Sequence, residues 1–260
     1  MFKYLLYFSL ISPILGVSQQ QIKGVFFPAT DYKSTILYRL SEGKSTYVSY
    51  GFVNPYGEIQ IDLDASVPAG IYRLVYALPQ SEFNFEFIYN GLESIEFKFN
   101  TETGVEFINS KENQLLYSYN SSIAIAQNEL VQLYAQPKFD SLIYLRRAQK
   151  IDSLQNTFEE ISNGTLASHF ISANKSYIPA RVEPVNSYVS NVKSNYFKAI
   201  DFQDPVLQGS NFIIDKLREY ILKIHISSTP SFQDYQANID MIFRVLETTD
   251  VNYQLTTLNI

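Results

Sequence analysis

The sequence contains no cysteine and no tryptophan, and its only two histidines are His169 and His225. The lack of cysteine excludes disulfide bonds, thiolate metal sites, thiol catalysis and a lipid anchor on an N-terminal cysteine. Neither histidine has a second histidine or an acidic residue at the spacing of a helical metal site, which argues against zinc and imidazole chemistry. We therefore expect no metal ion, no cofactor and no catalytic residue.

The sequence also lacks the glycine-rich motifs of nucleotide-binding proteins and the Gly-x-Ser-x-Gly motif of α/β-hydrolases. Asp62 and Asp64 form a carboxylate pair, but strand alternation predicts that both lie on an exposed face. Glycoside hydrolysis needs two carboxylates and neither cysteine nor histidine, so it is the enzyme class that the composition excludes least. With that class left open, the prediction is a protein that is not an enzyme.

Positive charge is also scarce, with 20 Lys and Arg against 26 Asp and Glu, a net charge of −6. A chain without a basic excess is not typical of proteins that follow a phosphate backbone, so we expect no nucleic-acid partner. Hydrophobic residues make up 46% of the chain and charged residues 18%, which is the composition of a globular protein.

The N-terminus has the pattern of a secretory signal peptide. Lys3 precedes an apolar run from Leu5 to Val17, and small residues at Gly16 and Ser18 favour cleavage before Gln19. The run is shorter than the roughly 20 residues that span a bilayer. We predict a signal peptide over residues 1–18, export to the periplasm or cell envelope, and no membrane span after cleavage.

Residues 19–109 have the two-residue period of β-strands. Ile59, Ile61 and Leu63 alternate with polar residues, and similar runs occupy 84–89 and 94–99. Turn signals separate these runs at 54–57 and 101–104, and Asn90-Gly91 is a strong hairpin signal. We expect about eight strands in an antiparallel β-sandwich or barrel.

Residues 110–260 have the period of α-helices instead. One apolar stripe begins at Leu116, and further helices are predicted near 151–161, 185–196 and 213–224. Ser231 and Asp234 have the spacing of a capping box before a last helix. The first and last stripes comprise Leu116, Tyr119, Ile123, Ala126, Leu130 and Leu133, and Phe232, Tyr235, Ile239, Phe243 and Leu246. The predicted fold class is α+β, with a β domain followed by an α-helical domain.

Tyrosine is concentrated in the β half, at Tyr38, Tyr47, Tyr50, Tyr72, Tyr76 and Tyr89. Aromatic side chains pack well against cross-strand neighbours, so a structural role is the simpler interpretation. Contact with a glycan or a peptide is the alternative.

The most specific stretch runs from residue 195 to residue 210, with the sequence NYFKAIDFQDPVLQGS. Asp204 followed by Pro205 is typical of a helix N-cap and first turn. Phe197 and Phe202 are expected in the core, and Asp201 is expected to anchor the loop. The predicted structural motif therefore consists of Tyr196, Phe197, Asp201, Phe202, Asp204, Pro205 and Ser210.

This stretch resembles a segment of the exported thioredoxin-like proteins of Bacteroidota, in which Ser210 would open a helix carrying Lys216 and Tyr220. The β half is similar to the N-terminal domain of those thiol–disulfide oxidoreductases, in Gly24, the Asn54–Gly57 turn and the strand entry Pro68-x-Gly70-x-Tyr72. The family usually continues into a thioredoxin domain with a Cys-x-x-Cys pair. The chain lacks these cysteines, so the resemblance carries no redox activity to it.

These observations lead to three hypotheses of function. The first is an exported, non-catalytic module that binds or positions an envelope protein or peptide, a thioredoxin-like protein being one candidate partner. The second is the substrate-recognition half of a thiol–disulfide oxidoreductase whose thioredoxin domain is separate or missing. The third is glycan binding through the tyrosine-rich sheet.

Overall fold

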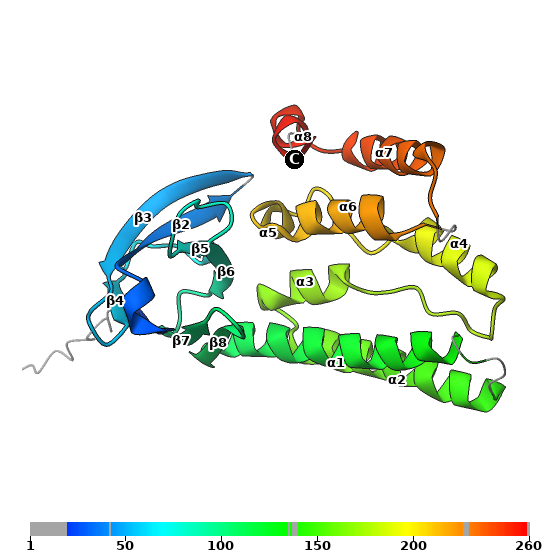
Figure 1. Ribbon diagram of the computed structural model, residues 1–260, viewed down its shortest axis with the longest axis horizontal. Coiled ribbons are helices and arrows are strands. Elements are labelled where there is room, and N and C mark those ends of the chain that lie inside the picture. The colour runs from blue at the N-terminus through cyan, green and yellow to red at the C-terminus, as the bar shows by residue number, and fades with distance from the viewer. Residues whose placement is uncertain (1–19, 42, 135, 137–139, 226–228, 259–260) are drawn as a thin grey trace, which may run out of the picture.

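A computed structural model describes residues 20–41, 43–134, 136, 140–225 and 229–258. The predicted signal peptide and its cleavage site before Gln19 lie outside these residues. The structure confirms the α+β class, with strands in the N-terminal half and helices after them (Figure 1). The strands are β1 (Gln21–Phe27), β2 (Ser34–Ser41), β3 (Lys44–Phe52), β4 (Glu58–Asp62), β5 (Gly70–Val75), β6 (Asn84–Tyr89), β7 (Ile95–Asn100) and β8 (Gly104–Asn109), with a 3₁₀ turn at Ala29–Asp31.

The strands form two four-stranded sheets, in the orders β4-β1-β7-β8 and β3-β2-β5-β6. The described strands do not close into a barrel, so that part of the expectation is wrong. The expectation of purely antiparallel pairing is also wrong, because β1 and β7 are parallel, with Gly24 opposite Phe97. Alternation shows which residues share a face of a strand but not the direction of the neighbouring strand. Parallel neighbours need a long connection, and here the chain builds the second sheet between them.

The Asn90-Gly91 turn does not form the predicted hairpin. The strands on its two sides, β6 and β7, belong to different sheets, so the turn carries the chain from one sheet to the other. Gly91 has a positive φ of 73°, a conformation that glycine adopts readily because it has no Cβ atom. The local conformation was thus predictable. The pairing was not, because β6 pairs with the preceding strand, β5, and β7 pairs with β1, which is distant in sequence.

The other two turn predictions are confirmed. The backbone N–H of Gly57 donates to the carbonyl of Asn54 at 2.9 Å, which closes a β-turn between β3 and β4. Asn100 pairs with Gly104 across the β7–β8 hairpin, where Gly104 has φ of 79°.

One hydrophobic cluster draws side chains from both sheets, and we call it the inner cluster. Phe26 lies near its centre, with ring centroids 4.7 Å from Tyr32 and 5.7 Å from Phe97. Tyr72 and Tyr89 are buried there, which supports the packing interpretation for these two tyrosines. Its buried members are Ile22, Phe26, Tyr32, Leu37, Ile59, Ile61, Leu63, Tyr72, Leu74, Phe87, Tyr89, Ile95, Phe97 and Phe99.

The helical half begins directly after β8, which matches the expected change of secondary structure near residue 110. Its helices are α1 (Lys111–Tyr134), α2 (Ser141–Ile161), α3 (Ala167–Ala173), α4 (Val185–Asn195), α5 (Pro205–Gln208), α6 (Phe212–Lys223), α7 (Phe232–Leu246) and α8 (Val251–Leu258). Periodicity predicted neither the short helices α3 and α5 nor α8. No helix in the described ranges combines the length and apolarity needed to cross a membrane.

The helices pack beside the second sheet rather than apart from it (Figure 1). Their hydrophobic cluster includes Leu40, Ile71 and Ile88, which lie on β2, β5 and β6. The start of α1 is also covered, since Ser110 and Asn113 are 1% and 5% exposed. The strand-rich and helical halves therefore share a buried surface at their junction.

The predicted stripe of the last helix is wrong at two positions, because Phe232 and Phe243 are 77% and 51% exposed. Its last member, Leu246, is buried as predicted, and the stripe omitted Asn238 and Ile242, which are also buried. The amide of Asn238 donates to the carbonyls of Tyr220 at 2.8 Å and Ile224 at 3.2 Å, near the end of α6. Carbonyls at a helix end need such partners, so a polar contact sets which face of α7 is inside. The capping box of Ser231 and Asp234 is present as predicted.

Candidate functional site

Asp204 occupies the predicted N-cap of α5. Its Oδ1 accepts hydrogen bonds from the backbone N–H groups of Val206 at 2.8 Å and Leu207 at 3.3 Å, and Pro205 lies in the first turn. Its Oδ2 lies 2.6 Å from Nδ1 of His169 on α3. The N-cap could be predicted from the sequence because its partners are adjacent in the chain. The contact with His169 could not be predicted, because the two residues are 35 positions apart.

The neighbouring motif residues hold the chain between α4 and α6. The ring centroid of Phe197 lies 5.7 Å from that of Phe202 and 4.6 Å from that of Tyr220. Asp201 accepts a hydrogen bond from the backbone N–H of Gln203 at 2.9 Å, within its own turn. The hydroxyl of Ser210 donates to the carbonyl of Leu207 at 2.8 Å and accepts from the backbone N–H of Phe212 at 3.2 Å.

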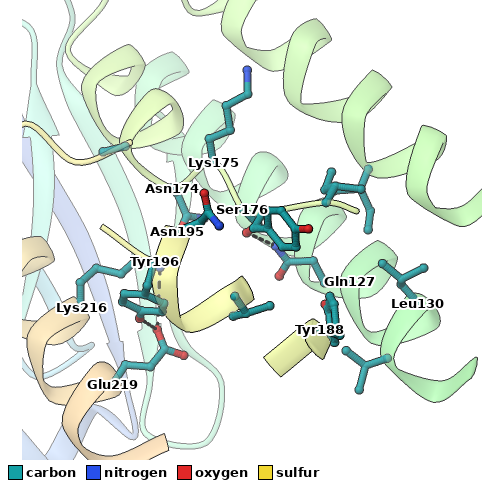
Figure 2. Close-up of a pocket in the computed structure, with 16 residues that line it drawn as sticks. Gln127, Leu130, Asn174, Lys175, Ser176, Tyr188, Asn195, Tyr196, Lys216 and Glu219 are labelled. Atoms are coloured by element: carbon teal, nitrogen blue, oxygen red, sulfur yellow. Dashed lines mark hydrogen bonds and ion pairs between the residues drawn. The ribbon is translucent and has the colours of Figure 1, made fainter. Parts of the chain in front are cut away.

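Tyr196 lines a cavity within the helical half. Two adjoining cavities, of about 220 Å³ and about 450 Å³, lie among α1, α2, the segment after α3, α4 and α6. We call them together the helical cleft, and Figure 2 shows the smaller of the two. Both are lined by Gln127, Ile151, Lys175, Ser176, Tyr177, Ile178 and Asn195.

A polar group of three side chains stands on one wall of the helical cleft. The hydroxyl of Tyr196 donates a 2.5 Å hydrogen bond to Oε2 of Glu219 (Figure 2). Nζ of Lys216 lies 3.8 Å from the same carboxylate oxygen and 5.6 Å from the centroid of the Tyr196 ring. Lys216 and Glu219 are one turn apart on α6, so the helix itself places both beside Tyr196.

Burial changes the acidity of this group. Desolvation, followed by the hydrogen bond to Glu219, raises the pKa of the Tyr196 hydroxyl well above its usual range. Desolvation lowers the pKa of the Lys216 ammonium, and the charge of Glu219 opposes that change. The side chain of Lys216 is 24% exposed, so it remains open to the cleft. The tyrosine is therefore a hydrogen-bond donor and not a base at neutral pH.

The opposite wall is aromatic. The ring of Tyr188 stacks on that of Tyr134 at 4.8 Å between centroids. The hydroxyl of Tyr177 donates to Glu183 at 2.9 Å, and Asn191 donates to the same carboxylate at 3.0 Å. Aromatic faces thus stand at both ends of the cleft.

Side chains with amide and hydroxyl groups line the cleft between these two walls. Nε2 of Gln127 donates to the hydroxyl of Ser176 at 2.7 Å, and Nδ2 of Asn195 donates to the carbonyl of Asn191 at 2.8 Å. Asn174 lines the same cavity. Primary amides carry both donors and acceptors, so such side chains can pair with either kind of ligand group. This combination of aromatic faces and convergent polar groups is typical of binding pockets.

Asp62, Asp64 and the pair of His169 and Asp204 lie outside the residues that line the helical cleft. Within the described ranges, no three His, Asp or Glu side chains are grouped so that they could hold a metal ion. Asp62 and Asp64 are exposed, as expected, and the backbone N–H of Ser66 holds the pKa of Asp64 below its usual value.

Comparison with known protein families finds no family model that matches the chain, and comparison with curated proteins finds no significant similarity. The case for function therefore depends on the geometry of the cleft. Sequence reasoning singled out Tyr196 and placed Lys216 in a motif, but it missed Gln127, Tyr188 and Glu219 as lining residues. The spacing of Lys216 and Glu219 on α6 was the available signal.

Proposed function

We propose that the protein is an exported, non-catalytic binding module whose ligand occupies the helical cleft. The observation that carries this proposal is the meeting of aromatic rings, amides and one partly buried lysine around two adjoining cavities. The proposed ligand is a peptide or small polar molecule of the cell envelope. Tyrosine faces would pack against its apolar parts, and the amides of Gln127 and Asn195 would match its polar groups.

Blocking the cleft tests this proposal. Ser176 is exposed and lines both cavities, so Ser176→Trp should fill the cleft at little cost in stability. The control is Ser172→Trp, because Ser172 is exposed four residues earlier and lines neither cavity. A panel of amino acids, short peptides and oligosaccharides would be screened by the NMR shifts of the Gln127 and Asn195 side-chain amides.

We expect saturable shifts with a subset of the panel in the native protein and in Ser172→Trp, and none in Ser176→Trp. If Ser176→Trp keeps the same ligands with the same affinity, the cleft is not the binding site. If the native amides respond to no member of the panel, the proposal of a small polar or peptide ligand is wrong.

Glycan binding is a second candidate, favoured by exposed aromatic residues on β3. Tyr47, Tyr50 and Phe52 are 56%, 56% and 73% exposed. They pair with Tyr38, Ile36 and Ser34 of β2, which alternate along that strand, so the three rings share one face of the edge of the second sheet. Exposed rings on one face can stack on the C–H faces of sugars.

Affinity electrophoresis through gels containing soluble polysaccharides tests this second candidate. Retardation of the native protein that is lost in Tyr50→Ala, and kept in Tyr117→Ala, would support it; Tyr117 on α1 is 69% exposed and serves as the control. Equal mobility of all three proteins would count against it.

We also infer that the two sheets face one another as a β-sandwich. The inner cluster supports this inference, since Phe26 and Phe97 come from one sheet and Tyr72 and Phe87 from the other.

A further inference from the structure

Lys216 is a partly buried charged group of the helical cleft whose hydrogen-bond donors are incompletely used. An ammonium group has three N–H donors and no acceptor. The carboxylate oxygen paired with Nζ of Lys216, on Glu219, is 3.8 Å away, which is longer than an ordinary hydrogen bond. The rings of Tyr196 and Phe212, with centroids 5.6 Å and 5.7 Å from Nζ, supply a weaker electrostatic contact. The cation therefore retains donors that an incoming group can use.

Glu219 does not accept a close hydrogen bond from the Lys216 ammonium. Its Oε2 already accepts the 2.5 Å hydrogen bond of Tyr196, and the distance to Lys216 is too long for a hydrogen bond. The tyrosine thus holds the carboxylate at a fixed distance from the ammonium. The site is left with a nearby negative charge but without a direct acceptor.

Three lysines and two carboxylates line the helical cleft. Lys175, Lys198 and Lys216 line the two cavities, against Asp152 and Glu219. Lys175 is partly neutralised by Glu159, whose Oε1 lies 3.3 Å away. Lys216 is the lysine that stands in the smaller cavity beside an aromatic ring, where a charge-assisted hydrogen bond is less screened by water than at the rim.

We propose that Lys216 binds a carboxylate group of the ligand, whose adjoining apolar part packs against the ring of Tyr196. This proposal depends on the proposed function, because it assigns one ligand group to the helical cleft. A peptide C-terminus, an acidic side chain and an aromatic acid share this chemistry. A ligand carboxylate beside Nζ would oppose the desolvation that lowers the pKa of Lys216.

The test compares benzoate with benzamide, which have the same shape but differ in charge. The full chain would carry ¹³C-labelled lysine, and the Cε–H signal of Lys216 would be identified by its absence in Lys216→Arg. We expect benzoate to shift this signal saturably at millimolar concentration. We expect benzamide to bind about tenfold more weakly or not to shift it, because it lacks the negative charge that strengthens a hydrogen bond from an ammonium group.

Two lysine variants on α6 complete the test. Lys216→Met should abolish the preference for benzoate, as followed by the side-chain amide of Asn195, whereas Lys223→Met should keep it. Lys223 lies on the same helix, is exposed, and lines neither cavity. The wild-type comparison is decisive by itself if Lys216→Met does not fold.

The outcomes separate this inference from the proposed function. Equal shifts with benzoate and benzamide, or no shift of Lys216 with either, would overturn the carboxylate assignment. If the Asn195 amide still responds to neutral members of the earlier panel, and Ser176→Trp removes that response, the cleft remains the binding site. If Lys216 shows no preference for benzoate and the Asn195 amide responds to no member of the panel, both proposals are wrong.

Discussion

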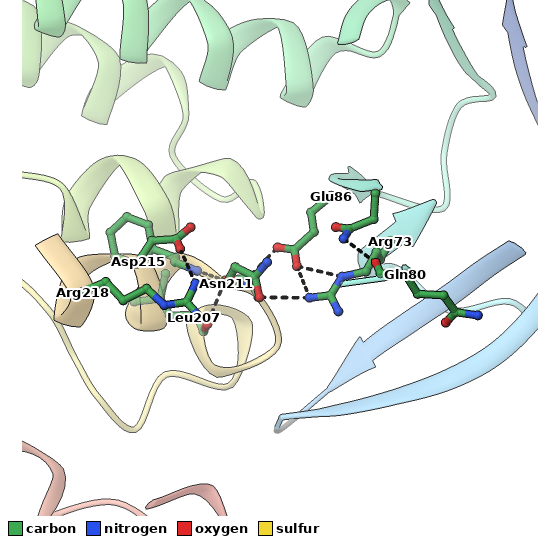
Figure 3. Close-up of polar contacts among 10 residues, drawn as sticks. Arg73, Gln80, Glu86, Leu207, Asn211, Asp215 and Arg218 are labelled. Atoms are coloured by element: carbon green, nitrogen blue, oxygen red, sulfur yellow. Dashed lines mark hydrogen bonds and ion pairs between the residues drawn. The ribbon is translucent and has the colours of Figure 1, made fainter. Parts of the chain in front are cut away.

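Nη2 of Arg73 on β5 donates a 2.9 Å hydrogen bond to Oδ1 of Asn211, the residue that precedes α6 and lies 138 positions later in the chain. Glu86 on β6 joins both residues, because one oxygen pairs with Arg73 at 2.5 Å and the other accepts from the backbone N–H of Asn211 at 2.9 Å (Figure 3). These three residues fix the start of α6 against the second sheet. Because α6 carries Lys216 and Glu219, the sheet helps to position one wall of the helical cleft.

Removing Arg73 should loosen this junction. We expect Arg73→Met to lower the free energy of unfolding by about 1–3 kcal/mol, because it leaves the carboxylate of Glu86, whose side chain is 19% exposed, without its cation. Urea unfolding at neutral pH measures the change. The control is Arg218→Met, since Arg218 pairs with Asp215 at 3.6 Å between side chains that are 54% and 67% exposed. That substitution should cost about 0–1 kcal/mol, and an equal loss in both variants would contradict the role given to Arg73.

Asn113, near the start of α1, forms a second set of hydrogen bonds across the junction between the second sheet and the helices. Its Nδ2 donates to the carbonyl of Ile88 at 2.7 Å, and its Oδ1 accepts from the N–H of Ile88 at 2.8 Å. Since β6 is at the edge of the second sheet, this buried amide supplies partners that a further strand would otherwise provide.

We expect Asn113→Ala to cost about 1–3 kcal/mol for each buried backbone group of Ile88 that stays unpaired. Hydrogen exchange should identify the cause, because the amide of Ile88 should lose more protection than those of the other β6 residues. Gln114→Ala is the control: Gln114 donates to the carbonyls of Phe107 and Ile108 from an exposed position. If Ile88 stays as protected as in the native protein, the amide does not stabilise the strand edge.

Local features of this fold were predictable, and its long-range pairings were not. The stripe from Tyr119 to Leu133, the cap at Asp204 and the capping box at Ser231 depend on neighbours within a few residues, so their patterns are visible in the sequence. Asn90-Gly91 has the right backbone for a tight turn, but the partners of β6 and β7 were decided elsewhere. The helical cleft likewise collects side chains from several helices, and only the packing of those helices brings Tyr188 and Lys216 to one cavity.

The buried polar residues explain the remaining error. The hydrophobic stripe of α7 omitted Asn238, which is fully buried because it satisfies carbonyls at the end of α6. A periodicity argument counts apolar residues and treats an asparagine as exposed. The face of a helix that is buried can therefore be misjudged when one hydrogen-bonding residue fixes its rotation.

The stability of α7 should depend on pH through Asp234. Hydrogen bonds from the backbone N–H and the hydroxyl of Ser231 hold the pKa of Asp234 below its ordinary value of 3.8. A folded-state pKa below the unfolded value means that the carboxylate contributes stability above about pH 4, which is lost as the pH falls through the folded value. The stability difference between the native protein and Asp234→Ala should therefore be constant from pH 7 to pH 5 and shrink towards pH 2.

Thermal unfolding at a series of pH values, in a constant salt concentration, measures this difference. Asp240→Ala is the control, because Asp240 is an exposed carboxylate on the same helix that does not belong to the capping box. A difference for Asp234→Ala that is unchanged at pH 2 would show that the charge of the capping box does not stabilise the helix.

The parallel pairing of β1 and β7 leads to a prediction about the stability of Gly24 variants. Gly24 lies opposite Phe97, and a Cβ atom on Gly24 would come within 2.1 Å of Cζ of that ring. Phe97 is 1% exposed and packs against Phe26 at 5.7 Å, so the ring has little space to move. Gly24→Ala should therefore destabilise the protein by about 1–3 kcal/mol through overpacking.

A double-mutant cycle separates this clash from a general effect of the substitution. Phe97→Leu alone should be destabilising because it leaves a cavity, but it also removes the ring atoms that alanine would meet. The double variant should thus be more stable than the sum of the single changes predicts, by roughly 0.5–3 kcal/mol. A parallel cycle with Phe87→Leu should be additive, because Phe87 does not provide the contacts nearest to Gly24. Additivity in both cycles would show that Phe97 is not what requires glycine at this position.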